Sequence, residues 1–208
     1  MIFTKVDLLL FLEKLKDIME QNRGYLIDLD SVVGDGDLGL TMGDGFAAAF
    51  DEVAHTTESD LGKILYQAGK AMSIKVPSTM GTLMASGFMQ AGKELKGKTE
   101  LKDEEFVTLF QAYFDGVAGR GKAKVGEKTF LDGLYPAVES LKTGVAKGKN
   151  LPLLVEEAAI AAEKGFQNTT TMIAVHGRAA TRGEESRKLE DPGAAVAMLM
   201  MRALKESI

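Results

Sequence analysis

The segment Asp28–Met42 reads DLDSVVGDGDLGLTM. Four aspartates fall within ten positions, and three glycines are interleaved with the last two aspartates. Glycine permits a positive φ, so this segment can turn sharply and direct several side chains at one point. Carboxylates that converge repel one another unless a cation lies between them, and hard oxygen donors favour Mg²⁺ or Ca²⁺ over softer metals. The segment therefore indicates a divalent-cation site, with a solvated acidic turn as the alternative.

Two familiar loop types do not fit the sequence. An EF-hand loop beginning at Asp35 needs a metal ligand at its fifth position and glutamate at its twelfth, where this chain has Gly39 and Phe46. The glycine-rich segments match no Walker pattern, which excludes a P-loop protein. Mg²⁺ commonly shares its shell between one or two carboxylates, water and substrate phosphates, which points to a metal–nucleotide site.

Composition restricts the remaining classes. The 208 residues are 45% hydrophobic, enough for a sizeable core in a single domain over residues 1–208. A net charge of −5 without a basic patch argues against nucleic acid as a partner. The chain has no cysteine, which excludes disulfides and cysteine nucleophiles. No apolar run reaches the roughly 20 residues of a membrane span, and the start lacks the basic region of a signal peptide, so we expect a cytoplasmic protein.

Apolar residues recur at helical spacing along most of the chain, and no convincing run alternates as a strand does. Thr4 and Asp7 resemble a capping box at the first helix, and Asp191 with Pro192 marks the start of the last helix. Pro77 interrupts the middle of the chain. We expect helices near residues 8–24, 46–53, 61–73, 82–91, 103–118, 129–141, 153–165 and 192–204. About eight helices with short connections predict an all-α fold.

Three connections besides the acidic segment combine glycine with polar or charged residues. They are residues 77–81, residues 119–129 with one arginine and three lysines, and residues 176–185 leading to residues 191–193. Glycine lets backbone N–H groups approach phosphate oxygens, and arginine can form a forked pair with them. For each connection the alternative is a helix-capping glycine beside a solvated charge.

Histidine chemistry has little support in the sequence. His55 lies in a polar linker and is expected in solvent. His176 adjoins Gly177 and Arg178, where a helix C-cap is favoured over contact with a ligand. A Ser-His-Asp triad has no serine elbow to support it. We therefore do not expect a phosphohistidine within this chain.

Taken together, these segments resemble the L subunit of dihydroxyacetone kinase, the DhaL family, and the matching nucleotide-binding domain of the single-chain kinases. The resemblance spans most of the chain in the family's order and is carried by Leu29-Asp30, Gly34-Asp35-Gly36-Asp37, Arg120-Gly121-Lys122-Ala123-Lys124, Gly126-Glu127-Lys128-Thr129, Asp132, Gly177-Arg178-Ala179, Gly183-Glu184, Ser186 and Asp191-Pro192-Gly193-Ala194. It implies a closed barrel of about eight antiparallel amphipathic helices, with a nucleotide site in the loops at one end.

The same resemblance implies roles for individual residues. Asp30, Asp35 and Asp37 resemble the ligands of two Mg²⁺ ions, and together with Arg178 they resemble the catalytic groups. The positions that resemble contacts to ADP or ATP are Leu38, Thr41, Ser78, Thr79, Met80, Gly121, Phe130, Arg178, Asp191, Pro192 and Gly193. Two divalent ions would offset the carboxylates and a diphosphate, and would neutralise charge that develops during phosphoryl transfer.

Several positions depart from the family pattern. Leu38 stands where the family usually has histidine, and residues 77–82 (PSTMGT) replace a Gly-Gly-Ala-Ser-Gly-Pro loop. Residues 181–190 (TRGEESRKLE) replace a segment usually read as Tyr-Leu-Gly-Glu-Arg-Ser-Ile-Gly-His-Gln. The metal ligands are thus kept while the nucleotide walls and the rim differ, which indicates a divergent paralogue.

The implied function is that of a phosphotransferase subunit. The chain would pass a phosphoryl group through Mg–nucleotide to dihydroxyacetone, or to another small sugar such as a ketotetrose, held by a separate sugar-binding kinase subunit. A phosphocarrier subunit of the phosphotransferase system would recharge the nucleotide, or ATP would exchange freely. The alternative is a nucleotide-binding regulatory module without turnover. The sequence leaves the oligomeric state open, with a homodimer as one candidate, and we expect neither nucleic acid nor a membrane as a partner.

Overall fold

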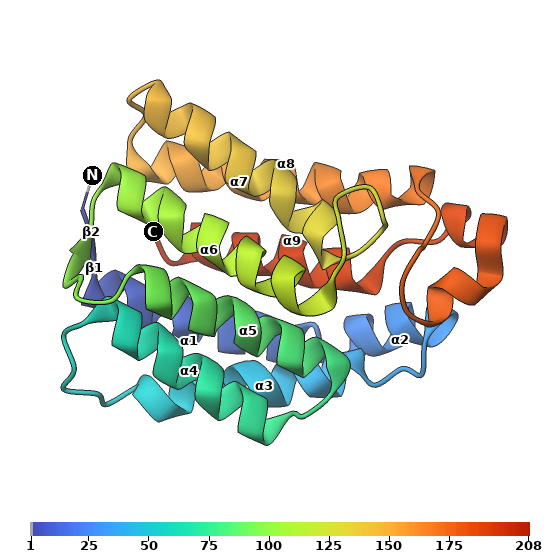
Figure 1. The fold of residues 1–208 in the computed structure, drawn as a ribbon, viewed down its shortest axis with the longest axis horizontal. Helices are drawn as coiled ribbons and strands as arrows, with labels where there is room; N and C mark the ends of the chain where they lie inside the picture. The colour runs from blue at the N-terminus through green and yellow to red at the C-terminus, as the bar shows by residue number, and fades with distance from the viewer. Residues whose placement is uncertain (1) are drawn as a thin grey trace.

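The computed structural model describes residues 2–208, most of which lie in helices packed side by side (Figure 1). The helices are α1 (Lys5–Gln21), α2 (Arg23–Val33), α3 (Leu38–Val53), α4 (Leu61–Lys75), α5 (Thr79–Glu94), α6 (Asp103–Gly121), α7 (Phe130–Ala146), α8 (Leu151–Asn168) and α9 (Pro192–Glu206). Two 3-10 segments, η1 (Thr169–Thr171) and η2 (Arg178–Lys188), precede α9. Two short strands, β1 (Phe3–Thr4) and β2 (Glu100–Leu101), pair in antiparallel fashion. The all-α prediction is confirmed.

The helices surround a common apolar core. Neighbours pack in the order α1, α3, α4, α5, α6, α7 and α9, and α9 also lies against α1, while α8 packs on both α7 and α9. Buried side chains from all nine helices form one hydrophobic cluster within residues 2–208. Aromatic rings connect neighbouring helices inside it: Phe88 of α5 contacts Phe46 of α3 and Tyr113 of α6. The site described below is therefore built on a rigid helical frame.

Local capping decides where several helices begin, as the sequence predicts. Thr4 and Asp7 form a reciprocal capping box at α1. Asp191 caps α9, and Pro192 occupies its first position, where a missing N–H costs nothing. Pro77 lies between α4 and α5, so the predicted interruption is confirmed.

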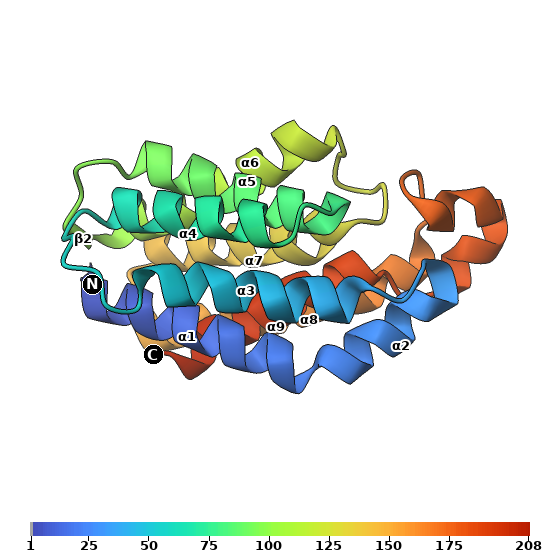
Figure 2. The ribbon, with the colours of Figure 1, turned by 90° about the horizontal axis from the view of Figure 1, so that it is seen from below.

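Much of the acidic segment is helical, whereas the sequence predicts a loop. Asp30 lies in the last turn of α2, and only Gly34–Asp37 forms a turn before α3. The first helix does not run to Gly24, because the N–H and side-chain amide of Asn22 both donate to the carbonyl of Ile18 and close its last turn. The expectation of one helix followed by a long acidic loop is therefore wrong. Figure 2 shows α2 continuing from α1 at an angle, beside the start of α3.

The two ends of the molecule differ. The strands, the first described residues and the last turn of α9 lie at one end, on the left of Figure 1. The Gly34–Asp37 turn, α2 and η2 lie at the other end. Across residues 2–208, no helix is both long and apolar enough to cross a membrane.

Candidate functional site

An open cleft of about 880 Å³ lies at the end that carries the Gly34–Asp37 turn. Small-molecule sites typically enclose roughly 300–1,000 Å³, so the cleft has the size of a small-molecule site. Its lining comes from segments that are far apart in the chain, within residues 30–38, 77–83, 117–131, 176–179 and 191–193. The structure therefore brings the acidic turn together with all of the glycine-containing connections.

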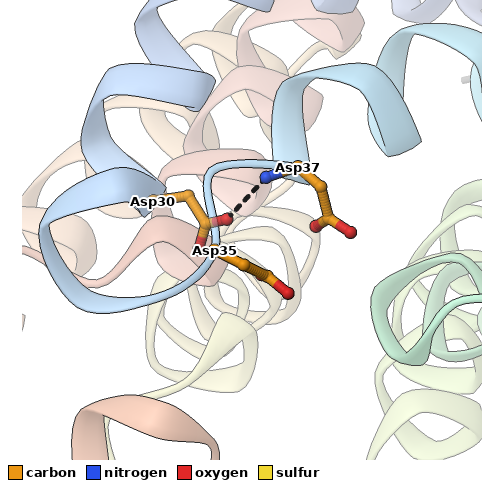
Figure 3. A group of neighbouring side chains, drawn as sticks. All are labelled: Asp30, Asp35 and Asp37. Atoms are coloured by element: carbon orange, nitrogen blue, oxygen red, sulfur yellow. Dashed lines mark hydrogen bonds between the residues drawn. The ribbon is translucent and has the colours of Figure 1, made fainter.

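Asp30, Asp35 and Asp37 form an acidic cluster on one wall of this cleft (Figure 3). Each offers a carboxylate oxygen that lies within 4.8 Å of those of the other two. Oδ2 of Asp30 accepts a hydrogen bond of 3.1 Å from the N–H of Asp37, which closes the turn. Gly36 has a φ of 74°, a conformation that glycine adopts without strain. The turn thus places two further carboxylates beside the one at the end of α2.

The negative charge of the acidic cluster is only partly offset. Burial, followed by the charges of Asp35 and Asp30, raises the pKa of Asp37. Arg178 of η2 donates from Nη2 to Oδ2 of Asp35 at 2.7 Å. Within the described part of the chain, no second cation forms an ion pair with the acidic cluster. Three carboxylates and one guanidinium leave net negative charge on oxygen donors, which fits a hard divalent cation.

Four helices begin at the cleft. Their N-cap residues are Asp37 for α3, Ser78 for α5, Thr129 for α7 and Asp191 for α9, and all four line the cleft. Helix N-termini carry unpaired N–H groups and the positive end of the helix dipole, so they attract phosphate. The cleft thus combines oxygen donors for a cation with helix ends that suit a polyanion.

Gly193 brings two of these helix starts close together. A Cβ at this position would lie 3.0 Å from the backbone nitrogen of Phe130, so a side chain there would require the start of α7 to shift by a few tenths of an ångström. Asp191 is buried beside them, and its Oδ2 accepts the N–H of Ala194 at 2.7 Å. Burial raises the pKa of Asp191 to about 7, while the bond from Ala194 and the charge of Lys128 oppose the shift. The start of α9 therefore packs closely against the start of α7 and forms one side of the cleft.

Nearly all positions that the sequence assigns to nucleotide contact lie in the cleft. Those that line it are Leu38, Ser78, Thr79, Met80, Gly121, Phe130, Arg178, Asp191, Pro192 and Gly193. Thr41 is outside the lining: it lies one turn into α3, is 8% exposed, and donates its N–H to the carbonyl of Asp37 at 3.0 Å. The structure places Thr41 beneath the acidic turn.

The sequence did not predict some residues of the cleft, and it assigned others the wrong role. Leu83 and Val117 add an apolar wall that no local signal marked. His176 is not a helix C-cap, because it lies between η1 and η2; it lines the cleft, and its Nε2 lies 2.6 Å from Oε2 of Glu127. The sequence suggests that the lysines of residues 119–129 could bind phosphate, but the side chain of Lys128 is buried. Burial of a lysine in a glycine-rich segment depends on distant contacts, so the sequence carries no local signal for it.

Comparison with known proteins identifies the family of this chain. A family model described as the DAK2 domain matches residues 32–206. The chain belongs to the DAK2-domain family. A relative from Escherichia coli (strain K12), named PEP-dependent dihydroxyacetone kinase, ADP-binding subunit DhaL, is 34% identical over 204 residues, which cover 98% of this chain and 97% of the relative. An L-erythrulose kinase from Pectobacterium atrosepticum is 29% identical over 188 residues, which cover 89% of this chain and 32% of the relative.

A solved structure shares the fold of this DAK2-domain chain. The dihydroxyacetone kinase from C. freundii, in complex with AMP-PNP and Mg²⁺, matches it with a TM-score of 0.70 at 24% identity. The match covers 95% of this chain and 33% of that chain. This chain therefore spans about a third of the length of that kinase.

Proposed function

We propose that this chain is the nucleotide-binding subunit of a dihydroxyacetone-type kinase. The observation that carries the proposal is the acidic cluster, which shares one cleft with the N-termini of α5, α7 and α9. A relative named as an ADP-binding subunit matches nearly the whole chain, which supports the same assignment. The chain would bind ADP or ATP with Mg²⁺ and act as a phosphotransferase toward a short ketose.

Asp30, Asp35 and Asp37 are the proposed ligands of two Mg²⁺ ions. These carboxylates would hold the ions at the cleft, where divalent positive charge would offset the negative charge that develops during phosphoryl transfer. The N–H of Asp37 holds the carboxylate of Asp30 in place, so this ligand is oriented before any ion binds. Arg178, held beside Asp35, is the proposed catalytic cation and would contact a phosphate oxygen.

The remaining cleft residues are proposed to bind the nucleotide itself. The N-termini of α5 and α9, at Ser78–Met80 and Asp191–Gly193, would receive phosphate oxygens through backbone N–H groups. Leu38, Gly121 and Phe130 would form the walls around the rest of the nucleotide. Thr41 would support the Gly34–Asp37 turn from below. We also propose that the ring of helices closes as an eight-helix barrel over a single domain, with this site at one end.

The sugar is proposed to come from another protein. The cleft is lined by groups that suit a cation and phosphates, and it is open to solvent, so a ketose held by a separate sugar-binding subunit can reach the phosphoryl group. The Escherichia coli relative is named PEP-dependent, which favours recharging of the bound nucleotide by a phosphocarrier subunit over exchange of ATP. The relative named L-erythrulose kinase makes a ketotetrose the second candidate substrate.

Calorimetric titration with ADP, with and without Mg²⁺, tests the proposal, followed by phosphoryl transfer with purified sugar-binding and phosphocarrier subunits. We expect binding that requires Mg²⁺ and transfer to dihydroxyacetone. A ligand at 100 times its Kd should add about 2.7 kcal/mol to the free energy of unfolding. Binding without transfer to any short ketose would instead identify a regulatory module. Absence of Mg²⁺-dependent binding of either nucleotide would overturn the assignment.

A further inference from the structure

Lys128 has a backbone conformation that lysine rarely adopts. Its φ is 61°, and within residues 2–208 the only other residue besides glycine with a positive φ is Lys122, at 56°. The two lysines differ in environment, because Lys122 is exposed and Lys128 is 3% exposed. Lys122 has this conformation as the C-cap of α6, a common place for it, whereas Lys128 caps no helix end and needs surrounding contacts to enforce it; such positions cluster at functional sites.

The contacts that enforce it are backbone carbonyls. Nζ of Lys128 donates to the carbonyl of Thr169 at 2.6 Å, to that of Ser186 at 2.8 Å, and to that of Leu189. The carbonyls of Met172 and Arg187 lie farther away, each at 3.4 Å. An ammonium group has three donors, so the three near carbonyls can use all of them. The result is a cage of carbonyl oxygens with a cation at its centre.

These carbonyls lie at both ends of the stretch that carries Arg178. Thr169 begins η1, directly after α8, whereas Ser186 and Leu189 lie at the end of η2, just before the start of α9. Lys128 itself directly precedes Thr129, the N-cap of α7. One side chain therefore joins the start of α7 to both ends of residues 169–189.

The other contacts that hold this stretch are mostly polar, and they include two to Glu127. The buried residue that η2 contributes is the polar Ser186, so η2 has no buried apolar face that could anchor it to the core. Polar contacts replace it: Arg182 donates to the carbonyl of Val32, and Arg187 donates to that of Thr171 at 2.6 Å. Removing the ammonium of Lys128 would leave several interior carbonyls without a donor, which is costly in a buried position.

We propose that Lys128 is a positioning residue, a tethered cation that holds residues 169–189 so that Arg178 faces the acidic cluster across the cleft. Its effect on phosphoryl transfer rests on the proposed function, whereas its effect on the order of residues 169–189 does not. Carbonyl oxygens that converge in this way also replace the hydration shell of a free monovalent cation. Shortening the side chain should therefore create a site for ammonium or potassium.

Hydrogen exchange of Lys128→Gly, without metal or nucleotide, tests the structural part. Glycine adopts this backbone conformation without strain, so the variant removes the ammonium and its stem without adding a steric clash. Amides of residues 169–189 should exchange roughly ten to a hundred times faster than in the wild-type chain, with α1 and α4 unchanged. Lys122→Gly is the matched control and should exchange as the wild type does. Wild-type exchange of residues 169–189 in Lys128→Gly would overturn the proposal.

Added cations sharpen the test. Ammonium or potassium chloride should restore slow exchange in Lys128→Gly, and tetramethylammonium chloride of equal ionic strength, whose cation is too large for the cage, should not. Equal effects of all three salts would contradict a specific cation site. Should Lys128→Gly fail to fold, Lys128→Gln keeps a side chain of similar length without the charge, and the same exchange comparison applies. Wild-type protection in Lys128→Gln would show that the charge is not required.

Kinetics test the positioning role. Lys128→Gly should lower kcat for phosphoryl transfer by about tenfold or more, as expected when a transition-state contact is misplaced. Combined with Arg178→Ala, it should lower kcat little further, because both changes remove the same contact. Fully multiplicative losses would show that Lys128 does not act through Arg178. If the wild-type chain fails to bind Mg–ADP, the proposed function fails, and the exchange result alone decides the role of Lys128.

Discussion

Asp191 makes the pH dependence of stability a test of how the cleft is built. Burial raises the pKa of this carboxyl from an ordinary value of 3.8 to about 7. Between these values the folded protein holds a proton that the unfolded chain has released, so the free energy of unfolding falls as the pH rises through this window. Below it both states are protonated, and above it the contribution is constant. The pKa difference lowers the free energy of unfolding by at most about 4 kcal/mol across this window, since one pKa unit corresponds to about 1.4 kcal/mol.

The perturbation is Asp191→Asn, which keeps a side-chain oxygen for the N–H of Ala194 and removes the titration. Urea unfolding of both proteins is measured in EDTA from pH 5 to pH 8. Relative to the variant, the wild-type chain should lose about 2–3 kcal/mol over this range, because part of the full effect has already occurred at pH 5. Groups common to both proteins cancel in the comparison. Parallel stability profiles would refute the reasoning that burial raises this pKa.

Two further substitutions test the site and the core. Arg178→Ala should lower kcat for phosphoryl transfer by about 10- to 1,000-fold with little change in stability, because its ion pair is exposed. Steady-state kinetics measure this, and Arg202→Ala, on an exposed face of α9, should behave as the wild type. Phe88→Ala should cost about 3–5 kcal/mol in urea unfolding, because its buried ring contacts Phe46 and Tyr113. A cost under about 1 kcal/mol would show that this ring is not part of the core.

Much of the fold follows from local signals in the sequence. Apolar spacing and the caps at Thr4 and Asp191 are local, and they predict the long helices and the all-α class. α2 was missed because its glycine and aspartates favour turns, whereas packing on α3 makes it helical. η2 has no apolar periodicity, and Lys128 and Arg182 hold it through contacts far apart in sequence. Contacts between residues that far apart cannot be predicted from a local sequence pattern.

In the candidate site, too, some features follow from local sequence and others depend on contacts between distant residues. Asp28 and Asp30 look equivalent in the sequence, but two positions along a helix point about 200° apart, so only one of them can face the turn. The acidic cluster accordingly includes Asp30 and excludes Asp28. The pairing of His176 with Glu127 joins residues 49 positions apart, and spacing alone could not predict it.

The dependence of ADP binding on Mg²⁺ in Asp35→Asn/Asp37→Asn tests the central claim most directly. These two carboxylates are chosen because that of Asp30 also accepts a backbone hydrogen bond. Asp28→Asn is the control, since it removes a nearby charge outside the acidic cluster. In calorimetric titration the wild type and the control should bind ADP at least about tenfold more tightly with Mg²⁺, a gain of about 1.4 kcal/mol that the helical double variant should lose. Undiminished Mg²⁺-dependent binding in the double variant would contradict the account.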